Sequence, residues 1–166
     1  YNNNEIKFKI NNDKDDNFLI SWTQILNINV YINASNIKNY FVGNSSWKYN
    51  IIIPGFNNNE DKILIEAVSD LRGTIVDYPS PFKKMKNTKS DIQISASFKK
   101  TTFENIKIKY NNIYSEIKTL KPLNGYINFS GEKNIIPENG FDIYGVLNFI
   151  DLKDWKKINK NSNQDN

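Results

Sequence analysis

The chain has 166 residues, 39% of them hydrophobic, which is enough to build one domain around a core. Its net charge of +4 is spread along the chain almost entirely as lysine, and Arg72 is the only arginine. Cysteine and histidine are absent, which excludes zinc sites of the usual kind, thiol nucleophiles and histidine acid–base catalysis within these residues.

Strict alternation of apolar and polar residues predicts strands with one wet face along most of the chain. The clearest run is Asp91 to Phe98, in which every second residue is apolar or alanine. In chain order the runs are Ile6/Phe8/Ile10, Ile28/Val30/Ile32, Ile63/Ile65/Ala67, Ile92/Ile94/Ala96/Phe98, Ile106/Ile108/Tyr110, Ile127/Phe129 and Phe141/Ile143/Gly145/Leu147/Phe149. Short polar clusters between them, such as Asn11 to Asn17 and Gly131 to Gly140, are typical of the turns of an antiparallel meander.

The C-terminal part departs from this pattern. Between Ile150 and Ile158 the spacing predicts a short helix, capped by Asp151 or Asp154. The polar residues 159–166 are expected to form a disordered tail after a single β-rich unit over residues 1–158. Because the chain starts at Tyr1 without an initiator methionine, we expect it to be an internal section of a longer protein.

The predicted strands have apolar faces, but there is almost no amphipathic helix to cover them. Such a sheet either folds onto itself as a sandwich or barrel, or stays a curved groove that something else fills. The expected fold is therefore all-β: an antiparallel meander that forms a curved, groove-like sheet with a short C-terminal helix.

The residues give little support to enzyme chemistry, and we expect no catalytic residue, no metal and no cofactor. The acidic turn Asn11 to Asn17 fails as a calcium loop, because Phe18 and Gln24 stand where glycine and glutamate are needed. Nucleic acid is not an expected partner either, since the lysines are scattered and arginine is scarce.

Two stretches resemble a known family. Residues 47–84 combine a tryptophan-led strand, a Ser-Asp-Leu-Arg-Gly run and a Pro-Ser-Pro exit, and residues 135–158 combine a glycine-containing strand with Leu-x-x-x-Asp-Leu-x-x-Trp. Together they resemble the YhdP group of AsmA-like bacterial envelope proteins. The positions that carry the resemblance are Trp47, Ser69, Asp70, Leu71, Arg72, Gly73, Pro79, Pro81, Lys84, Gly145, Asp151, Leu152 and Trp155.

The resemblance implies a function that the residues alone do not give. Proteins of this group are anchored in the inner membrane, cross the periplasm as a β-sheet with a hydrophobic inner face, and are linked to phospholipid movement and envelope integrity. This chain would then be one periplasmic section. Its expected partners are phospholipid acyl chains, neighbouring sections of the same protein, and the membrane through regions outside these residues.

The residues predicted to line such a lipid groove are those on the apolar faces of the strands. They are Ile63, Ile65, Ile92, Ile94, Phe98, Ile106, Ile108, Ile143, Leu147 and Phe149. The same residues would equally form the core of an ordinary sandwich. Arg72 is expected to make an ion pair or to contact a lipid headgroup at the rim of the sheet. Gly73 is expected to relieve crowding or bend a long strand, and Pro79 and Pro81 to carry the chain off the sheet edge.

A different function stays open. The chain could be a self-contained β-sandwich that binds a protein or glycan through its loops and has no lipid role. A closed apolar core favours that alternative, whereas an open apolar trough favours lipid conduction.

Overall fold

The computed structural model describes residues 6–14, 16–27, 40–55, 61–100, 102–120, 122–147 and 149–156, the last two residues of the 102–120 range by their backbone alone. The strand predicted around Ile28, Val30 and Ile32 and the tail 159–166 lie outside these residues. Of the residues that the structure describes, 55% are in strands and 4% in a helix, and the main sheet is open and uncurled. The predicted all-β class is confirmed.

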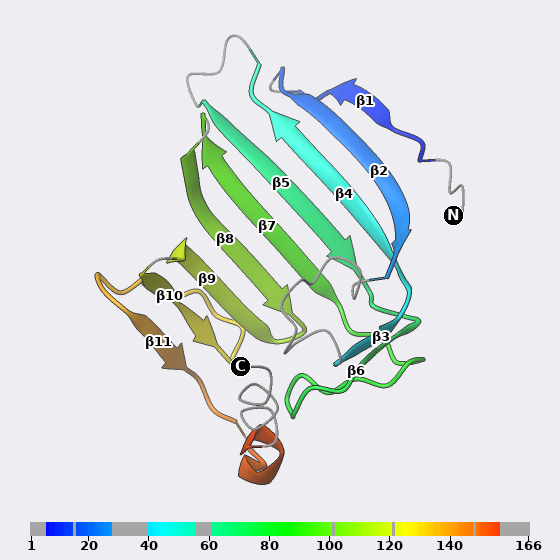
Figure 1. The fold of residues 1–166 in the computed structure, drawn as a ribbon. Coiled ribbons are helices and arrows are strands. Elements are labelled where there is room, and N and C mark those ends of the chain that lie inside the picture. Colours follow the sequence, from blue (N-terminus) through cyan, green and yellow to red (C-terminus); the bar gives the residue numbers. More distant parts are fainter. Residues whose placement is uncertain are drawn as a thin grey trace, which may run out of the picture.

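The main sheet has nine strands in the order β1-β2-β4-β5-β7-β8-β9-β10-β11 (Figure 1). They are β1 (Lys9–Asn12), β2 (Phe18–Leu26), β4 (Ser45–Ile53), β5 (Lys62–Ser69), β7 (Ile92–Lys99), β8 (Thr102–Tyr110), β9 (Ile113–Leu120), β10 (Leu123–Asn128) and β11 (Phe141–Tyr144). From β1 to β10 every neighbouring pair is antiparallel, as the meander prediction requires. The exception is β11, which pairs parallel to β10 after the long connection 129–140.

A second, two-stranded sheet is made of β3 (Phe41–Gly43) and β6 (Thr74–Val76). Figure 1 shows this small sheet at one end of the main sheet, beside the ends of β2, β5 and β7. No alternation in the sequence predicts it, because each of its strands has only three residues. The prediction that Gly73 bends a long strand is therefore wrong, because β5 ends at Ser69 and β6 is a separate strand of another sheet.

The C-terminal region confirms the short helix and corrects the strand before it. A helix covers residues 152–156, and Asp151 caps it by accepting a hydrogen bond from the backbone N–H of Lys153 at 2.8 Å. The predicted strand 141–149 ends at Tyr144, because Gly145 takes a φ of +95° that breaks the extended conformation. Leu147 and Phe149 therefore lie outside the sheet, which is a correction to their prediction as groove residues of a strand.

Candidate functional site: an apolar sheet face and its pocket

The register of the strands separates the main sheet into two faces of opposite character. We call one the apolar face; its members include Ile10, Phe18, Ile20, Trp22, Tyr49, Ile51, Ile63, Ile65, Ala67, Ile92, Ile94, Phe98, Ile106, Ile108, Tyr110, Ile113, Ile117, Ile127 and Ile143. The other, the polar face, carries mainly lysine, serine, asparagine and glutamate between occasional apolar residues. Eight of the ten predicted groove residues share the apolar face, and only Leu147 and Phe149 do not.

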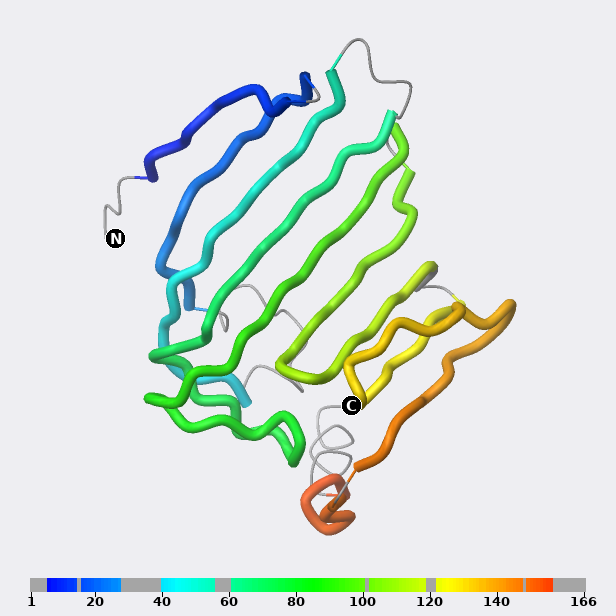
Figure 2. The backbone as a smooth tube through the Cα atoms, turned by 180° about the vertical axis from the view of Figure 1, so that it is seen from behind, coloured from blue at the N-terminus to red at the C-terminus, as the bar shows by residue number. Residues whose placement is uncertain are grey.

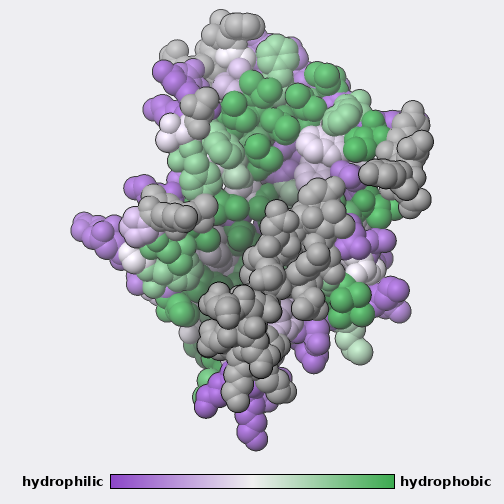
Figure 3. All heavy atoms as spheres, viewed as in Figure 1, coloured by the Kyte–Doolittle hydropathy of each residue, from purple (hydrophilic) through white to green (hydrophobic). Residues whose placement is uncertain are grey.

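One end of the apolar face is left partly open. Ile65 in the middle of β5 is 37% exposed, Phe18 at the start of β2 is 39% exposed, and Ile10 on the edge strand β1 is 66% exposed. Figure 3, drawn from this side, shows hydrophobic side chains gathered over the end of the sheet that lies away from β3 and β6. An apolar surface of this kind on a regular sheet is a site at which a hydrophobic ligand or partner gains free energy by leaving water.

The other end is covered and contains the core. Trp47, Leu71, Tyr110 and Ile113 are buried there as one cluster, with Phe82 packed against it. An aromatic group continues the cover: the ring of Phe82 lies 6.1 Å from that of Tyr78 and 6.3 Å from that of Trp155, centroid to centroid. The helix 152–156 thus contributes its tryptophan to the edge of this cover.

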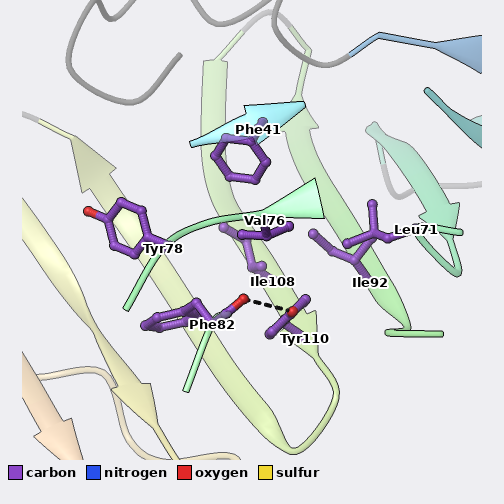
Figure 4. Close-up of a pocket in the computed structure, with 8 residues that line it drawn as sticks. All are labelled: Phe41, Leu71, Val76, Tyr78, Phe82, Ile92, Ile108 and Tyr110. Atoms are coloured by element: carbon purple, nitrogen blue, oxygen red, sulfur yellow. Dashed lines mark hydrogen bonds between the residues drawn. The ribbon is translucent and has the colours of Figure 1, made fainter. Parts of the chain in front are cut away.

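Between the cover and the sheet lies an apolar pocket with a volume of about 240 Å³. Its floor is formed by Ile92, Ile108 and Tyr110 of β7 and β8. Its walls come from the second sheet and the loops beside it (Figure 4). The eight lining residues are Phe41, Leu71, Val76, Tyr78, Phe82, Ile92, Ile108 and Tyr110, and every one is apolar or aromatic.

Among the lining residues, the polar side-chain atoms are the hydroxyls of Tyr78 and Tyr110. The Tyr110 hydroxyl donates a hydrogen bond to the backbone carbonyl of Phe82 at 3.1 Å. This bond connects β8, which forms the floor of the pocket, to the loop that carries Phe82 over it. Burial raises the pKa of both Tyr78 and Tyr110, so both rings stay neutral at physiological pH. The pocket offers no charge and suits a hydrocarbon group. At about 240 Å³ it lies below the roughly 300–1,000 Å³ of sites that hold whole drug-sized ligands, so it has room only for a smaller apolar group.

Two pocket residues, Ile92 and Ile108, belong to the predicted groove set. No role was predicted for Phe41, Val76, Tyr78 and Phe82, which also line the pocket. Phe41 and Val76 come from strands of three residues, too short to give a period. Phe82 is presented by a turn in which its backbone N–H donates to the carbonyl of Pro79 at 3.0 Å. The Pro-Ser-Pro segment was the available signal, because prolines restrict the backbone on both sides of that turn.

Three of the residues that carry the family resemblance, Trp47, Ser69 and Leu71, are buried where the two sheets join. The Trp47 indole donates to Ser45 Oγ at 3.0 Å, and that hydroxyl also accepts from Thr74 Oγ1 at 3.1 Å. Ser69 Oγ accepts from the backbone N–H of Leu71 at 3.0 Å, which fixes the exit of β5. These residues, all buried, hold the second sheet against the first and thereby shape the pocket.

Arg72 makes the ion pair that was one of its two expected roles. Its Nε lies 3.6 Å from Asp70 Oδ2, and its backbone N–H donates to Asp70 Oδ1 at 3.1 Å. The guanidinium is largely exposed and does not line the apolar pocket. A pair so exposed contributes little to stability, about 0 to 1 kcal/mol.

Comparisons with known proteins identify no relative: no family model, no curated protein and no solved structure matches the chain. Within the described residues, no cluster of three or more acidic side chains is placed to hold a metal ion. No helix in that part of the chain is long and apolar enough to cross a membrane.

Proposed function

We propose that this chain is a section of a YhdP-type AsmA-like envelope protein, and that its apolar face and pocket carry phospholipid acyl chains between the inner and outer membranes. The observation that supports the proposal is a partly open apolar sheet face that ends in a pocket lined only by apolar and aromatic side chains. In this proposal the section lies in the periplasm and catalyses no reaction.

The energetics of such a path follow from the geometry of the sheet. Each methylene group that leaves water gains about 0.8 kcal/mol, so an acyl chain does not cross an aqueous compartment unaided. A sheet face with isoleucine on successive strands, as in the row Ile20, Ile51 and Ile65 across β2, β4 and β5, offers similar contacts at successive positions. A lipid on it moves without a deep free-energy minimum, and the headgroup stays in water.

Two residues of β5 give a matched test. Ile65 and Val68 are 37% and 38% exposed, but Ile65 lies on the apolar face and Val68 lies on the polar face opposite Lys48 and Gln93. We expect phospholipid to co-purify with the wild-type protein and with Val68→Asp, and to be lost from Ile65→Asp, as measured by native mass spectrometry and lipid extraction. Circular dichroism checks that both variants are folded.

Two outcomes would contradict lipid conduction. One is a wild-type protein free of lipid, which would favour the self-contained module that binds a protein or glycan. The other is an equal loss of lipid from both variants, which would mean that the apolar face is not the path. The envelope assignment is tested separately by fractionation of the full-length protein. We expect it in the inner-membrane fraction, and we expect added protease to reach this section only after the outer membrane is permeabilised.

A further inference from the structure

The polar face, on the far side of the sheet from the apolar pocket, contains a hollow of about 280 Å³ that is rich in lysine. Its lining residues are Gln93, Ser95, Lys107, Lys109, Tyr114, Gly131 and Lys133. The register brings them together: Gln93 of β7 stands opposite Lys109 of β8, which stands opposite Tyr114 of β9, and Ser95 stands opposite Lys107. Figure 2 views the molecule from this side.

The backbone on both sides of Lys133 is anchored to the rest of the protein. After β10 the chain turns back at Gly131, whose φ is +78° and where an added Cβ would meet the carbonyl oxygen of Asn112 at 2.9 Å. The backbone N–H of Asn134 then donates to the hydroxyl of the fully buried Tyr126 at 2.9 Å. Lys133 is fixed between these two anchor points, beside the turn that joins β8 and β9.

The charges at this hollow are unbalanced. Lys107 lies 3.7 Å from Glu116, whose carboxylate also accepts a hydrogen bond from Asn105 at 2.8 Å. Glu66, opposite Ser95, flanks the hollow without lining it. Among the residues that the structure describes, no carboxylate pairs with Lys109 or Lys133. Two ammonium groups thus face one hollow with hydroxyl and amide donors around them.

We propose that this hollow is a binding site for a phosphate-type oxyanion. A tetrahedral oxyanion offers several acceptor oxygens, which match lysine ammonium groups together with the hydroxyl of Ser95 and the amide of Gln93. Its negative charge also relieves the repulsion among the three lysines. The site stands on the opposite face from the apolar pocket and therefore does not rest on the proposed lipid path.

The test uses inorganic phosphate as the probe, followed by the backbone amide NMR shifts of the protein at constant ionic strength. We expect saturable shifts at Gln93, Ser95 and Lys109, with no such saturation when chloride replaces phosphate. The double variant Lys109→Gln/Lys133→Gln should bind at least about tenfold more weakly, because each lysine supplies a charge-assisted hydrogen bond. Lys86→Gln/Lys153→Gln, which changes the net charge equally at exposed sites outside the hollow, should bind like the wild type.

The source of the anion is distinguished with a second pair of probes. A water-soluble phosphate monoester is compared with vesicles of phosphatidylcholine that contain or lack phosphatidylglycerol. Saturation by the soluble ester identifies a free phosphate compound, and preferential binding of phosphatidylglycerol vesicles identifies a lipid headgroup. The proposal is overturned if no saturable shift appears at the hollow, or if the Lys86/Lys153 control loses binding as strongly as the Lys109/Lys133 variant.

Discussion

The buried ammonium group of Lys84 donates a hydrogen bond to the backbone carbonyl of Thr74 at 2.7 Å. The same group donates to the carbonyl of Met85 at 2.9 Å, and the backbones of Lys84 and Val76 exchange two further hydrogen bonds. Lys84 therefore acts as a third, minimal strand of the small sheet, and its side chain satisfies the carbonyl of the fully buried Thr74. One lysine thus fixes the cover of the apolar pocket.

Replacement of Lys84 by methionine should destabilise the protein while keeping most of the side-chain volume. The buried carbonyl of Thr74 would lose its ammonium partner, at a cost of about 1 to 3 kcal/mol. Urea unfolding of wild type, Lys84→Met and the exposed control Lys86→Met measures this. We expect the control to stay within about 0.5 kcal/mol of the wild type, and equal effects of the two variants would contradict the role of Lys84.

Gly73 should tolerate no side chain, because two backbones pass in contact there. Its φ is +91°, and an added Cβ would lie 2.1 Å from the carbonyl oxygen of Asn44. Gly140 has a similar φ of +85°, but an added Cβ there would meet no atom within 4 Å. Substitution of Gly140 therefore measures the cost of the positive φ alone, without a steric clash. We expect Gly73→Ala to cost about 2 to 5 kcal/mol and Gly140→Ala about 1 to 2 kcal/mol in thermal or urea unfolding. Equal losses would mean that the contact with Asn44 relaxes freely.

Strands with a single wet face were predictable from the sequence. The run Asp91 to Phe98 matches β7 to within a residue at each end, and Ile63/Ile65/Ala67 falls within β5. The alternation is regular in these strands because one side of each strand lies on the apolar face and the other side lies on the polar face. β2 and β4 were not among the predicted runs, because Leu19, Ile25 and Ile52 place apolar residues on the polar face as well and obscure the period.

The pocket was less predictable because it is built by contacts distant in sequence. Phe41 and Val76 meet only after β3 and β6 pair across more than thirty residues of chain. The parallel pairing of β10 with β11 likewise depends on the long connection 129–140. Alternation locates the floor of such a site, but its cover is fixed by tertiary contacts.

The protein should lose stability steeply in alkaline solution. Burial is the largest cause of the raised pKa values of Tyr78, Tyr110, Tyr114 and Tyr126. When folding raises the pKa of a group, the stability that this group contributes is fully present below the pKa of the unfolded state. That stability is lost as the pH rises from there through the pKa of the folded state. Above about pH 10, each tyrosine that stays protonated only in the fold should lower the unfolding free energy by about 1.4 kcal/mol per pH unit.

The buried Tyr114 gives the sharpest variant for this alkaline transition. Tyr114→Phe removes one titrating hydroxyl, so the pH midpoint of unfolding, followed by circular dichroism, should move upward. The unfolding free energy of the variant at neutral pH, where the tyrosine hydroxyl of the wild type is ionised in neither the folded nor the unfolded state, corrects for any change in stability that is independent of pH. Burial lowers the pKa of Lys84, which acts in the opposite sense and raises stability as the pH approaches 10.5. An unchanged midpoint in Tyr114→Phe would contradict the assignment of the alkaline loss to this ring.

Filling the apolar pocket should weaken binding there without closing the rest of the apolar face. Ile108 lies in the floor of the pocket, whereas Ile106, two residues earlier on the same face of β8, does not line it. Ile108→Phe adds volume inside the cavity and should weaken binding of the neutral apolar dye Nile red about tenfold, whereas Ile106→Phe should leave it unchanged. Both variants add bulk at a cost of about 1 to 3 kcal/mol, which urea unfolding measures in parallel. If both variants weakened dye binding equally, the dye would be binding the open sheet face and the pocket would not be the apolar site.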